Sequence, residues 1–276
     1  EDKIKSGLAA LGHGDKDGIE IASTNSAEHV EEYTAYLYQR LQRQGVLQRE
    51  CERMVRVYRT VFAACMVAAG DADAIITGGT RSYNAVLDDI HRVLDPAPGS
   101  LVFGLSILVA QGRTIFIADT TVHERPTAEE LAGIAEQSAD LARLLGHEPR
   151  VAMLSFSNFG NPVRERTDRI RDAVGLLDQR NVSFEYDGEM TVDVALNPDL
   201  LALYPFCRLS EPANILVMPG LHAANISAQL LQEFGGGTVI GPLVVGMSKP
   251  AQIVQMGATD SDIVTMAALA AHGANH

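Results

Sequence analysis

Apolar positions recur every three or four residues in several stretches of the chain, and this period predicts amphipathic helices. In residues 26–44, for example, Val30, Tyr33, Leu37 and Leu41 share one helical face. The same period predicts helices over residues 47–69, 83–94, 127–145, 164–180, 222–234 and 260–271.

Short apolar runs between these helices predict strands. They are residues 74–77, 101–110, 114–118, 151–156, 215–218 and 238–240. Gln111-Gly112-Arg113 predicts a hairpin between the second and third runs. The other strands alternate with helices, and several are apolar on both faces, which is typical of parallel strands covered on both sides. The pattern therefore predicts an α/β fold with mostly parallel sheets.

The composition narrows the class of protein. The 276 residues are 46% apolar and 21% charged, which is ordinary for a globular chain. No apolar run approaches the roughly 18 residues of a membrane span, so no membrane partner is expected. With 22 Lys and Arg against 35 Asp and Glu, the net charge of −13 argues against nucleic acid. An anionic ligand would have to be held by local groups.

The cysteines and the first residues indicate compartment and processing. Cys51, Cys65 and Cys207 form no CxxC pair, as expected for buried thiols in a reducing cytoplasm. The chain begins at Glu1 without an initiator Met and without a signal peptide. We therefore expect it to be a piece of a longer protein.

Ligands of such folds bind in loops that follow the carboxyl ends of strands. The loop 78–83 contains two glycines and Arg81, and it fits either a phosphate cradle or an ordinary strand-to-helix turn. The loop 155–160 carries Ser155, Ser157 and Asn158, which bind ligand oxygens or form plain turns with similar frequency.

Two further loops contain carboxylates. Residues 187–193 hold three of them, but no His or Cys completes a metal site there. The segment 241–262 ends with Asp262, three residues after Thr259. That spacing fits a capping box at the start of the last helix, and it also fits a catalytic carboxylate. His222, at another helix start, is read as a solvated or core histidine.

Four separated segments together resemble the phosphate acetyl/butyryltransferase family, in the family's order and spacing. They are Val151–Ser157, Asp187–Ala195, Ala213–Pro219 with Asn225, and Gly241–Gly246 followed by Lys249-Pro250. The resemblance extends from about Ala27 to Ala271.

The resemblance implies the two-lobed α/β/α phosphotransacetylase fold, similar to that of isocitrate and isopropylmalate dehydrogenases. Residues 1–98 and 241–276 would form the first lobe, without the family's initial strand–helix unit. Residues 99–240 would form the second lobe, through which the family dimerises. Acyl-CoA would bind in the cleft between the lobes.

Four shorter pieces are similar to the transferase-like C-terminal domain of bacterial hybrid NADP-dependent malic enzymes. They are Thr80–Tyr83, Ile117–His123, Ser157–Pro162 and Gln252–Gly257. This similarity implies an upstream catalytic domain in the same chain, which would convert malate to pyruvate and CO2. NADP and a divalent metal would bind in that upstream domain, and neither a metal nor a cofactor is expected here.

One departure from the family affects the chemistry. Active transferases carry Asp-Leu-Ser-Arg-Gly, followed five residues after the glycine by an aspartate. The resemblance implies that this aspartate is the base for the CoA thiol, with Ser beside it and Arg as the phosphate clamp. Here Gln255 and Met256 replace the Ser and Arg, whereas Gly257 and Asp262 remain.

We therefore expect a catalytically silent regulatory domain that binds acetyl-CoA or a related acyl-CoA and forms a homodimer or higher oligomer. The expected ligand contacts are Ser155, Ser157, Asn158, Asn225, Lys249, Gln255, Met256, Asp262 and Arg81. Two alternatives stay open. One is an active phosphate acetyltransferase that uses Arg81 or Lys249 as its clamp, and the other is an oligomerisation scaffold without a ligand.

Overall fold

The structure is a computed structural model, and it describes residues 2–13, 18–24, 27–162 and 165–274. The chain divides into two compact units. The helical unit is Glu1–Ala72 with Asp89–Leu94, and the sheet unit is Asp73–Asp88 with Asp95–His276. The lobe boundaries expected from the sequence stay a prediction. No described helix is long and apolar enough to cross a bilayer.

The helical unit is built around two aromatic side chains. Tyr33 packs edge-on against Phe62, with 5.3 Å between the ring centroids, and its hydroxyl donates to Asp71 Oδ2 over 2.6 Å. The helices of this unit are α1 (Asp2–Ala10), α2 (Ala27–Leu41), the 3-10 helix η1 (Gln42–Gln44), α3 (Gln48–Val57) and α4 (Arg59–Ala69).

The single helix expected over residues 47–69 is wrong, because the helix is interrupted at Tyr58. This residue has extended backbone, with φ −95° and ψ 101°, between α3 and α4. The interruption lets each helix bury its own apolar side chains, Cys51 and Val55 from α3 and Phe62 among those from α4. Packing of the unit therefore overrides the local helical pattern.

The sheet unit contains two sheets. Strands β1 (Ile75–Gly78) and β8 (Ala251–Val254) pair in parallel. The larger sheet has the order β5-β4-β6-β3-β2-β7. Its strands are β2 (Phe103–Ala110), β3 (Arg113–Ala118), β4 (Arg150–Leu154), β5 (Glu185–Met190), β6 (Ile215–Val217) and β7 (Thr238–Val245). β2 is antiparallel to β3 and β7, which confirms the predicted hairpin, and the other pairs are parallel.

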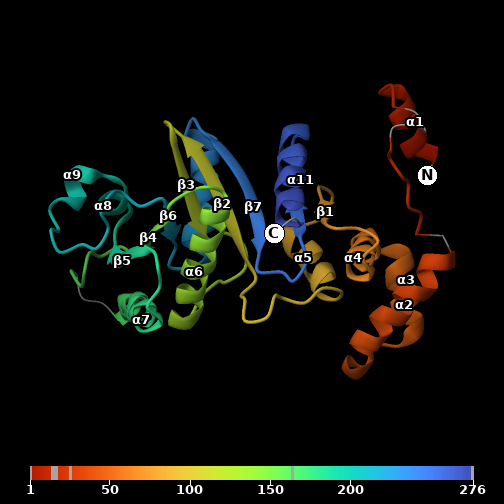
Figure 1. Cartoon of the computed structure of the whole chain (residues 1–276), viewed down its shortest axis with the longest axis horizontal. Helices are drawn as coiled ribbons and strands as arrows, with labels where there is room; N and C mark the ends of the chain where they lie inside the picture. The colour runs from red at the N-terminus through yellow and green to blue at the C-terminus, as the bar shows by residue number, and fades with distance from the viewer. Residues whose placement is uncertain (1, 14–17, 25–26, 163–164, 275–276) are drawn as a thin grey trace. The chain divides into compact units, whose positions relative to one another are not determined.

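Helices cover both faces of the larger sheet, as the apolar strands predict. α6 (Ala128–Leu144) and α7 (Glu165–Arg180) pack on one face. On the other face lie α8 (Val192–Leu196), α9 (Pro198–Leu201) and α10 (Leu221–Phe234). In Figure 1 α6 lies beside the larger sheet, where it packs against β3 and β6. The remaining described helices are α5 (Tyr83–His91), whose residues from Asp89 on belong to the helical unit, and α11 (Asp260–Ala274).

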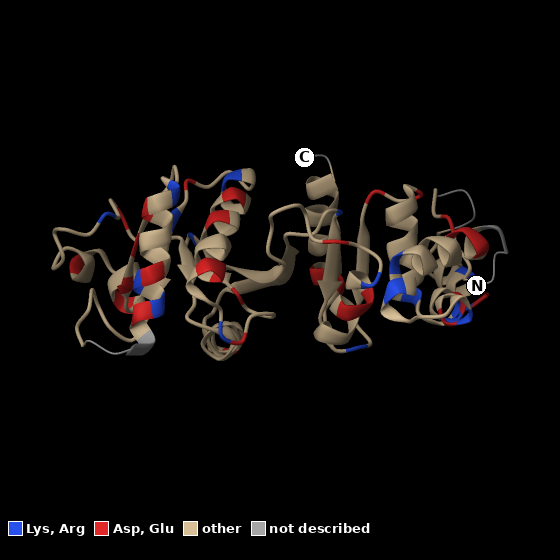
Figure 2. Cartoon of the chain, turned by 90° about the horizontal axis from the view of Figure 1, so that it is seen from below, with Lys and Arg blue, Asp and Glu red and all other residues tan. Residues whose placement is uncertain are grey.

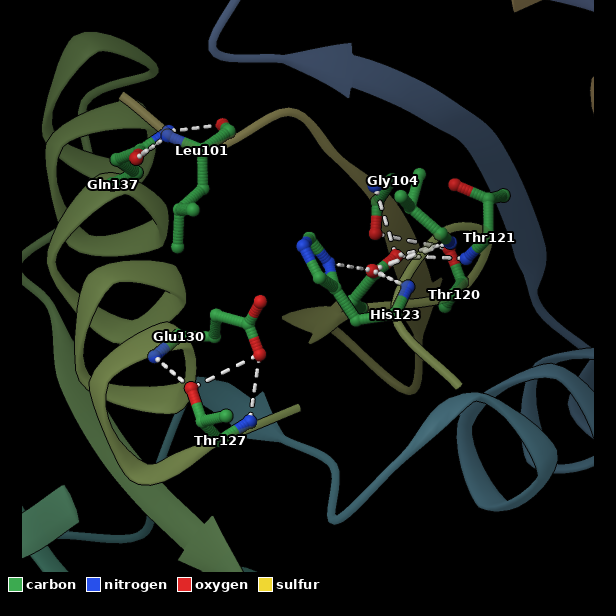
Figure 3. Close-up of polar contacts among 10 residues, drawn as sticks. Leu101, Gly104, Thr120, Thr121, His123, Thr127, Glu130 and Gln137 are labelled. Atoms are coloured by element: carbon green, nitrogen blue, oxygen red, sulfur yellow. Dashed lines mark hydrogen bonds and ion pairs between the residues drawn. The ribbon is translucent and has the colours of Figure 1, made fainter. Parts of the chain in front are cut away.

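The start of α6 confirms the predicted capping box. Glu130 N donates to Thr127 Oγ1 over 3.2 Å, and Thr127 N donates to Glu130 Oε2 over 2.7 Å (Figure 3). These reciprocal bonds satisfy amides that a helix start leaves without partners.

Three strands differ from the sequence expectation. β5 and β8 lie in segments read as loops, and β7 continues past Ile240 to Val245. Pro242 is accommodated because the pairing of β7 with β2 shifts register between Leu105 and Ile107. A proline cannot donate to a regular ladder, so it is found in strands at such irregularities.

Candidate functional site

The loops after β1 and β8 leave the same end of the two-stranded sheet. The strands are parallel, with Gly78 opposite Val254, and Gly79 N donates to Val254 O over 3.0 Å. Gly78 has φ +115°, and a Cβ on it would lie 2.2 Å from Val254 O, so only glycine fits this close approach. The Arg81 loop is therefore joined to the start of the segment that carries Gln255 and Met256.

A cavity of about 170 Å³ lies beside the second of these loops, wholly within the sheet unit. Three predicted site residues, Gln255, Met256 and Asp262, line it together. Its other lining residues are Gln232, Thr238 to Gly241, Ile253, Val254, Gly257, Ala258, Ser261, Thr265 and Met266. No Lys, Arg or His is among the described residues that line it. Met256 is 64% exposed, so the loop presents a thioether rather than a cation.

Asp262 forms the capping box that its spacing predicts. Thr259 N and Thr259 Oγ1 both lie 2.8 Å from Asp262 Oδ2, and Asp262 N donates back to Thr259 Oγ1 over 3.3 Å. The side chain is exposed at the start of α11. Both bonds that the carboxylate accepts end on Oδ2, so Oδ1 faces no donor among the described residues. Capping and chemistry are therefore compatible at this residue.

The serine-rich loop after β4 is bonded to β5. The Ser157 hydroxyl is 1% exposed and donates to Glu189 Oε1 over 2.9 Å. Asn158 Oδ1 accepts from Thr191 N over 2.8 Å. Ser155 lines a different cavity, of about 550 Å³ and largely apolar walls. These hydrogen bonds hold the ends of β4 and β5 together. The roles of Ser155, Ser157 and Asn158 as ligand contacts stay predictions.

Glu189 is a buried carboxylate that the sequence analysis did not single out individually. It is 0% exposed, and Gly160 N donates to its Oε1 over 2.8 Å. Its Oε2 is buried and has no hydrogen-bond partner among the described residues. The neighbouring Asp187 instead accepts from Arg208 N over 2.8 Å. The carboxylates of segment 187–193 thus have separate partners, and no described group of three or more His, Cys, Asp or Glu could hold a metal ion.

Asp119, directly after β3, anchors the loop of the Ile117–His123 segment, for which the sequence suggested a resemblance but no site residue. Gly104 N, Thr121 N and His123 N donate to its carboxylate over 3.0, 2.8 and 2.7 Å, and His123 Nδ1 lies 2.7 Å from Oδ2 (Figure 3). The i, i+4 spacing of Asp119 and His123 after a strand is the sequence signal for this pair. Asn225 of α10 is bonded to the same loop, through Thr120 O over 3.4 Å.

The surroundings shift the pKa values of both Asp119 and His123. Burial alone would raise the pKa of Asp119, but hydrogen bonds from His123 and from backbone N–H groups outweigh it and lower that pKa. The hydrogen bond to Asp119 raises the pKa of His123, against the opposing effect of burial. The pair is therefore favoured in its charged form.

Lys249 lies apart from the Gln255–Asp262 cavity. It lines a cavity of about 310 Å³ together with Ser248, Gln252 and His272, between the ends of α6 and α11. Arg81 lines neither of these cavities among the described residues. The structure thus brings three of the nine expected contacts into one cavity.

Comparison with known proteins extends over nearly the whole chain. The family model described as phosphate acetyl/butaryl transferase matches residues 2–271. An NADP-dependent malic enzyme of Rhizobium meliloti is 55% identical over 260 residues, which are 94% of this chain but 34% of that protein. The chain thus spans about a third of the length of that relative.

Shorter relatives match along most of their own length. A phosphate acetyltransferase of Clostridium acetobutylicum is 31% identical over 281 residues, covering 98% of this chain and 83% of that protein. The crystal structure of a phosphotransacetylase from Streptococcus pyogenes superposes with a TM-score of 0.90 at 27% identity, covering 99% of this chain and 83% of the other. The fold is therefore the phosphotransacetylase fold that the sequence predicts.

Proposed function

The chain belongs to the phosphate acetyl/butaryl transferase family, and we propose that it is a regulatory member of that family which binds an acyl-CoA without reacting it. The observation that carries the proposal is the Gln255–Asp262 cavity. It retains the carboxylate at the position of the family's base, and it has Gln255 and Met256 where active transferases carry Ser and Arg.

The substitution by methionine removes the charge that the transfer reaction needs. When a thiolate attacks an acyl phosphate, negative charge moves onto the leaving phosphate. Arginine holds such a group with a planar fork of donors, which the Met256 thioether cannot supply. Loss of one preorganised charge stabiliser costs about 10²–10³ in rate. The loss of the serine adds to this disadvantage, although the two effects need not be additive.

Binding without reaction is chemically reasonable for this cavity. An acyl-CoA carries a neutral thioester, which needs no cation beside it. The Gln255 amide can donate to the thioester carbonyl, and Met256 offers an adaptable apolar contact for the acyl group. Six further residues are proposed to contact the acyl-CoA outside this cavity, on the basis of the sequence resemblance. They are Ser155, Ser157, Asn158, Asn225, Lys249 and Arg81.

We place the chain within a longer, cytoplasmic NADP-dependent malic enzyme that converts malate to pyruvate and CO2. The similarity to about a third of such enzymes supports this placement. NADP and a divalent metal would bind in the catalytic part of that protein. Acyl-CoA can regulate the reaction only if it binds two states of the protein with different affinity.

Exposed apolar side chains of the sheet unit support the proposed dimer or higher oligomer. Phe156 and Val192 are 60% and 50% exposed, and both line the 550 Å³ apolar cavity. Exposed apolar side chains gathered at one cavity favour an interaction site. A second copy of the chain is the proposed occupant.

Restoration of the family's residues tests catalytic silence. The chain is assayed for thiol consumption with acetyl phosphate and CoA, as wild type and as Gln255→Ser/Met256→Arg. We expect a rate near background for the wild type and an increase of about 10²-fold or more in the double variant. Leu203→Arg, at an exposed apolar position away from the cavity, is the control for added charge. Wild-type turnover of several per second would establish an active transferase instead.

Calorimetry with acetyl-CoA tests ligand binding. We expect saturable binding that Met256→Glu weakens about 10-fold or more, because a carboxylate repels the anionic ligand and displaces the acyl group. Leu203→Glu is the matched control and should bind as the wild type does. Absence of binding at millimolar acetyl-CoA would leave the scaffold alternative.

Regulation is tested in the longer protein. The rate of NADPH formation from malate is measured with and without acetyl-CoA, in the wild type and in Met256→Glu. We expect acetyl-CoA to change the wild-type rate and to have less effect on the variant. An unchanged wild-type rate at saturating acetyl-CoA contradicts a regulatory role.

A further inference from the structure

The helical unit has a basic cavity that the proposed function does not use. Its volume is about 650 Å³, within the range of roughly 300–1,000 Å³ that is common for small-molecule sites. Arg49 and Arg53 of α3 and Arg92 line it, beside Tyr58. The other lining residues are Leu41, Gln44, Val46, Glu50 and Met54. Figure 2 shows Lys and Arg on the helices near the N-terminus.

Two of the three arginines in this cavity have no acidic partner among the described residues. Arg49 and Arg53 form no ion pair with any described residue. Glu50, the acidic residue of the lining, accepts instead from Leu47 N over 2.8 Å through Oε2. Arg92 Nη1 donates to the buried Asp89 over 2.7 Å, which fixes this guanidinium in place. Three guanidinium groups thus line one cavity, two of them without an ion pair, in a chain whose net charge is −13.

The position of Arg49 is locally unfavourable for the helix. Arg49 is the second residue of α3, and the partial positive charge at a helix start disfavours a cation there. Glu50 follows it in the same turn but forms no ion pair with it, so Arg49 violates a local preference without an ion pair of its own, which points to a role in binding. An anion in the cavity would compensate both arginines and the helix start.

A small inorganic anion fits this cavity less well than a larger phosphorylated ligand. A single small anion would leave most of 650 Å³ unfilled, and the half-buried ring of Tyr58 lines the same cavity. Arginine forks recognise phosphate oxygens in pairs, and aromatic or guanidinium planes stack on bases. We infer that this cavity is a binding site for a phosphorylated nucleotide, held by Arg49, Arg53 and Arg92.

The nucleotide can come from two sources, a free nucleoside diphosphate or the ADP part of a coenzyme. Both share the phosphate chemistry. The inference does not depend on the Gln255–Asp262 cavity, and it would hold if that cavity bound nothing.

Calorimetry with ADP on the 276-residue chain tests the inference. In low salt we expect a dissociation constant below about 1 mM, with an increase of at least 10-fold in Arg49→Gln/Arg53→Gln. Arg56→Gln is the matched control, because Arg56 lies on the same helix, pairs with Glu52 over 2.9 Å and does not line the cavity. It should change the constant less than 2-fold. Arg53→Lys keeps the charge but loses the fork, and it should give an intermediate loss.

Repeating the titration with acetyl-CoA distinguishes a free nucleotide from the ADP part of a coenzyme. If Arg49→Gln/Arg53→Gln weakens acetyl-CoA as well as ADP, whereas Met256→Glu leaves ADP unchanged, the cavity holds the nucleotide part of the coenzyme. If the double variant weakens ADP alone, the ligand is a free nucleotide. Absence of ADP and acetyl-CoA binding at this cavity up to 5 mM overturns the inference. An equal loss with Arg56→Gln also overturns it, because general surface charge then explains the binding.

Discussion

Asp119 lies in the loop after β3 and Asp262 in the first turn of α11, and the protein holds these two carboxylates in opposite ways. Asp119 is 3% exposed and accepts from the backbone N–H groups of Gly104, Thr121 and His123 and from the His123 ring. Asp262 is exposed and accepts from Thr259 through one oxygen. A carboxylate saturated with internal donors serves the fold, whereas one with an oxygen left over is available to a ligand.

Removal of Asp119 should have the largest effect on stability. Asp119→Ala leaves buried N–H groups and a charged His123 without their acceptor, and breaking a buried pair costs about 3–5 kcal/mol. Urea unfolding of the wild type and the variant measures the difference. Asp262→Ala is the comparison, with an expected loss of about 1 kcal/mol. Equal losses would show that the two carboxylates contribute to the fold in the same way.

The chemical availability of Asp262 is measured in the Gln255→Ser/Met256→Arg background. Asp262→Asn should lower any restored transferase rate by about 10²-fold or more, as expected for loss of a general base. Thr259→Ala removes the hydroxyl that bonds to Asp262 in the cap but keeps the Asp262 carboxylate, so most of the restored rate should remain. A rate that falls equally in both variants would assign Asp262 to capping alone.

The stability of the cap itself gives a smaller effect. Thr259→Ala should cost about 1 kcal/mol, because it removes an N-cap hydroxyl of α11. Thr127→Ala provides the parallel measurement for α6, whose capping box has the same reciprocal bonds. A loss at Thr259 well below that at Thr127 would mean that the α11 start frays in solution.

The Asp119–His123 pair predicts a pH dependence smaller than these changes. The folded pKa of Asp119 is lowered from 3.8, so its stabilisation is present above about pH 4 and is lost as pH falls through the folded pKa. The folded pKa of His123 is raised from 6.5, so its stabilisation is present below about pH 6.5 and is lost as pH rises through the folded pKa. The wild type should therefore exceed His123→Gln in stability by more at pH 5.5 than at pH 9. A constant difference across this range contradicts a charged pair.

Local patterns predicted the parts of the molecule that local physics determines. The hairpin at Gln111–Arg113, the Thr127 capping box and the spacing of Thr259 and Asp262 are confirmed. The approach of Gln255, Met256 and Asp262 to one cavity follows from a strand, a loop and a helix that are adjacent in sequence.

Contacts between distant residues explain what the sequence did not reveal. The sequence of β5 is polar because it contains Asp187 and Glu189. These carboxylates are buried in the fold, and their partners Arg208 and Ser157 lie 21 and 32 residues away in the chain. The same long-range bond buries Ser157, which the loop pattern alone presents as an exposed hydroxyl. Tyr58 interrupts a continuous helical period for the sake of packing in the helical unit.

The extended β7 strand has a consequence for solubility. β7 is the last strand of the larger sheet, so the side away from β2 is not paired with another described strand. Unpaired strand backbone is a template for aggregation, and natural proteins interrupt it with prolines and bulges. Pro242 lacks an N–H, and the pairing of β7 with β2 shifts register beside it. The Gly241-Pro242 pair therefore makes this edge of the sheet less able to pair with a strand of another molecule.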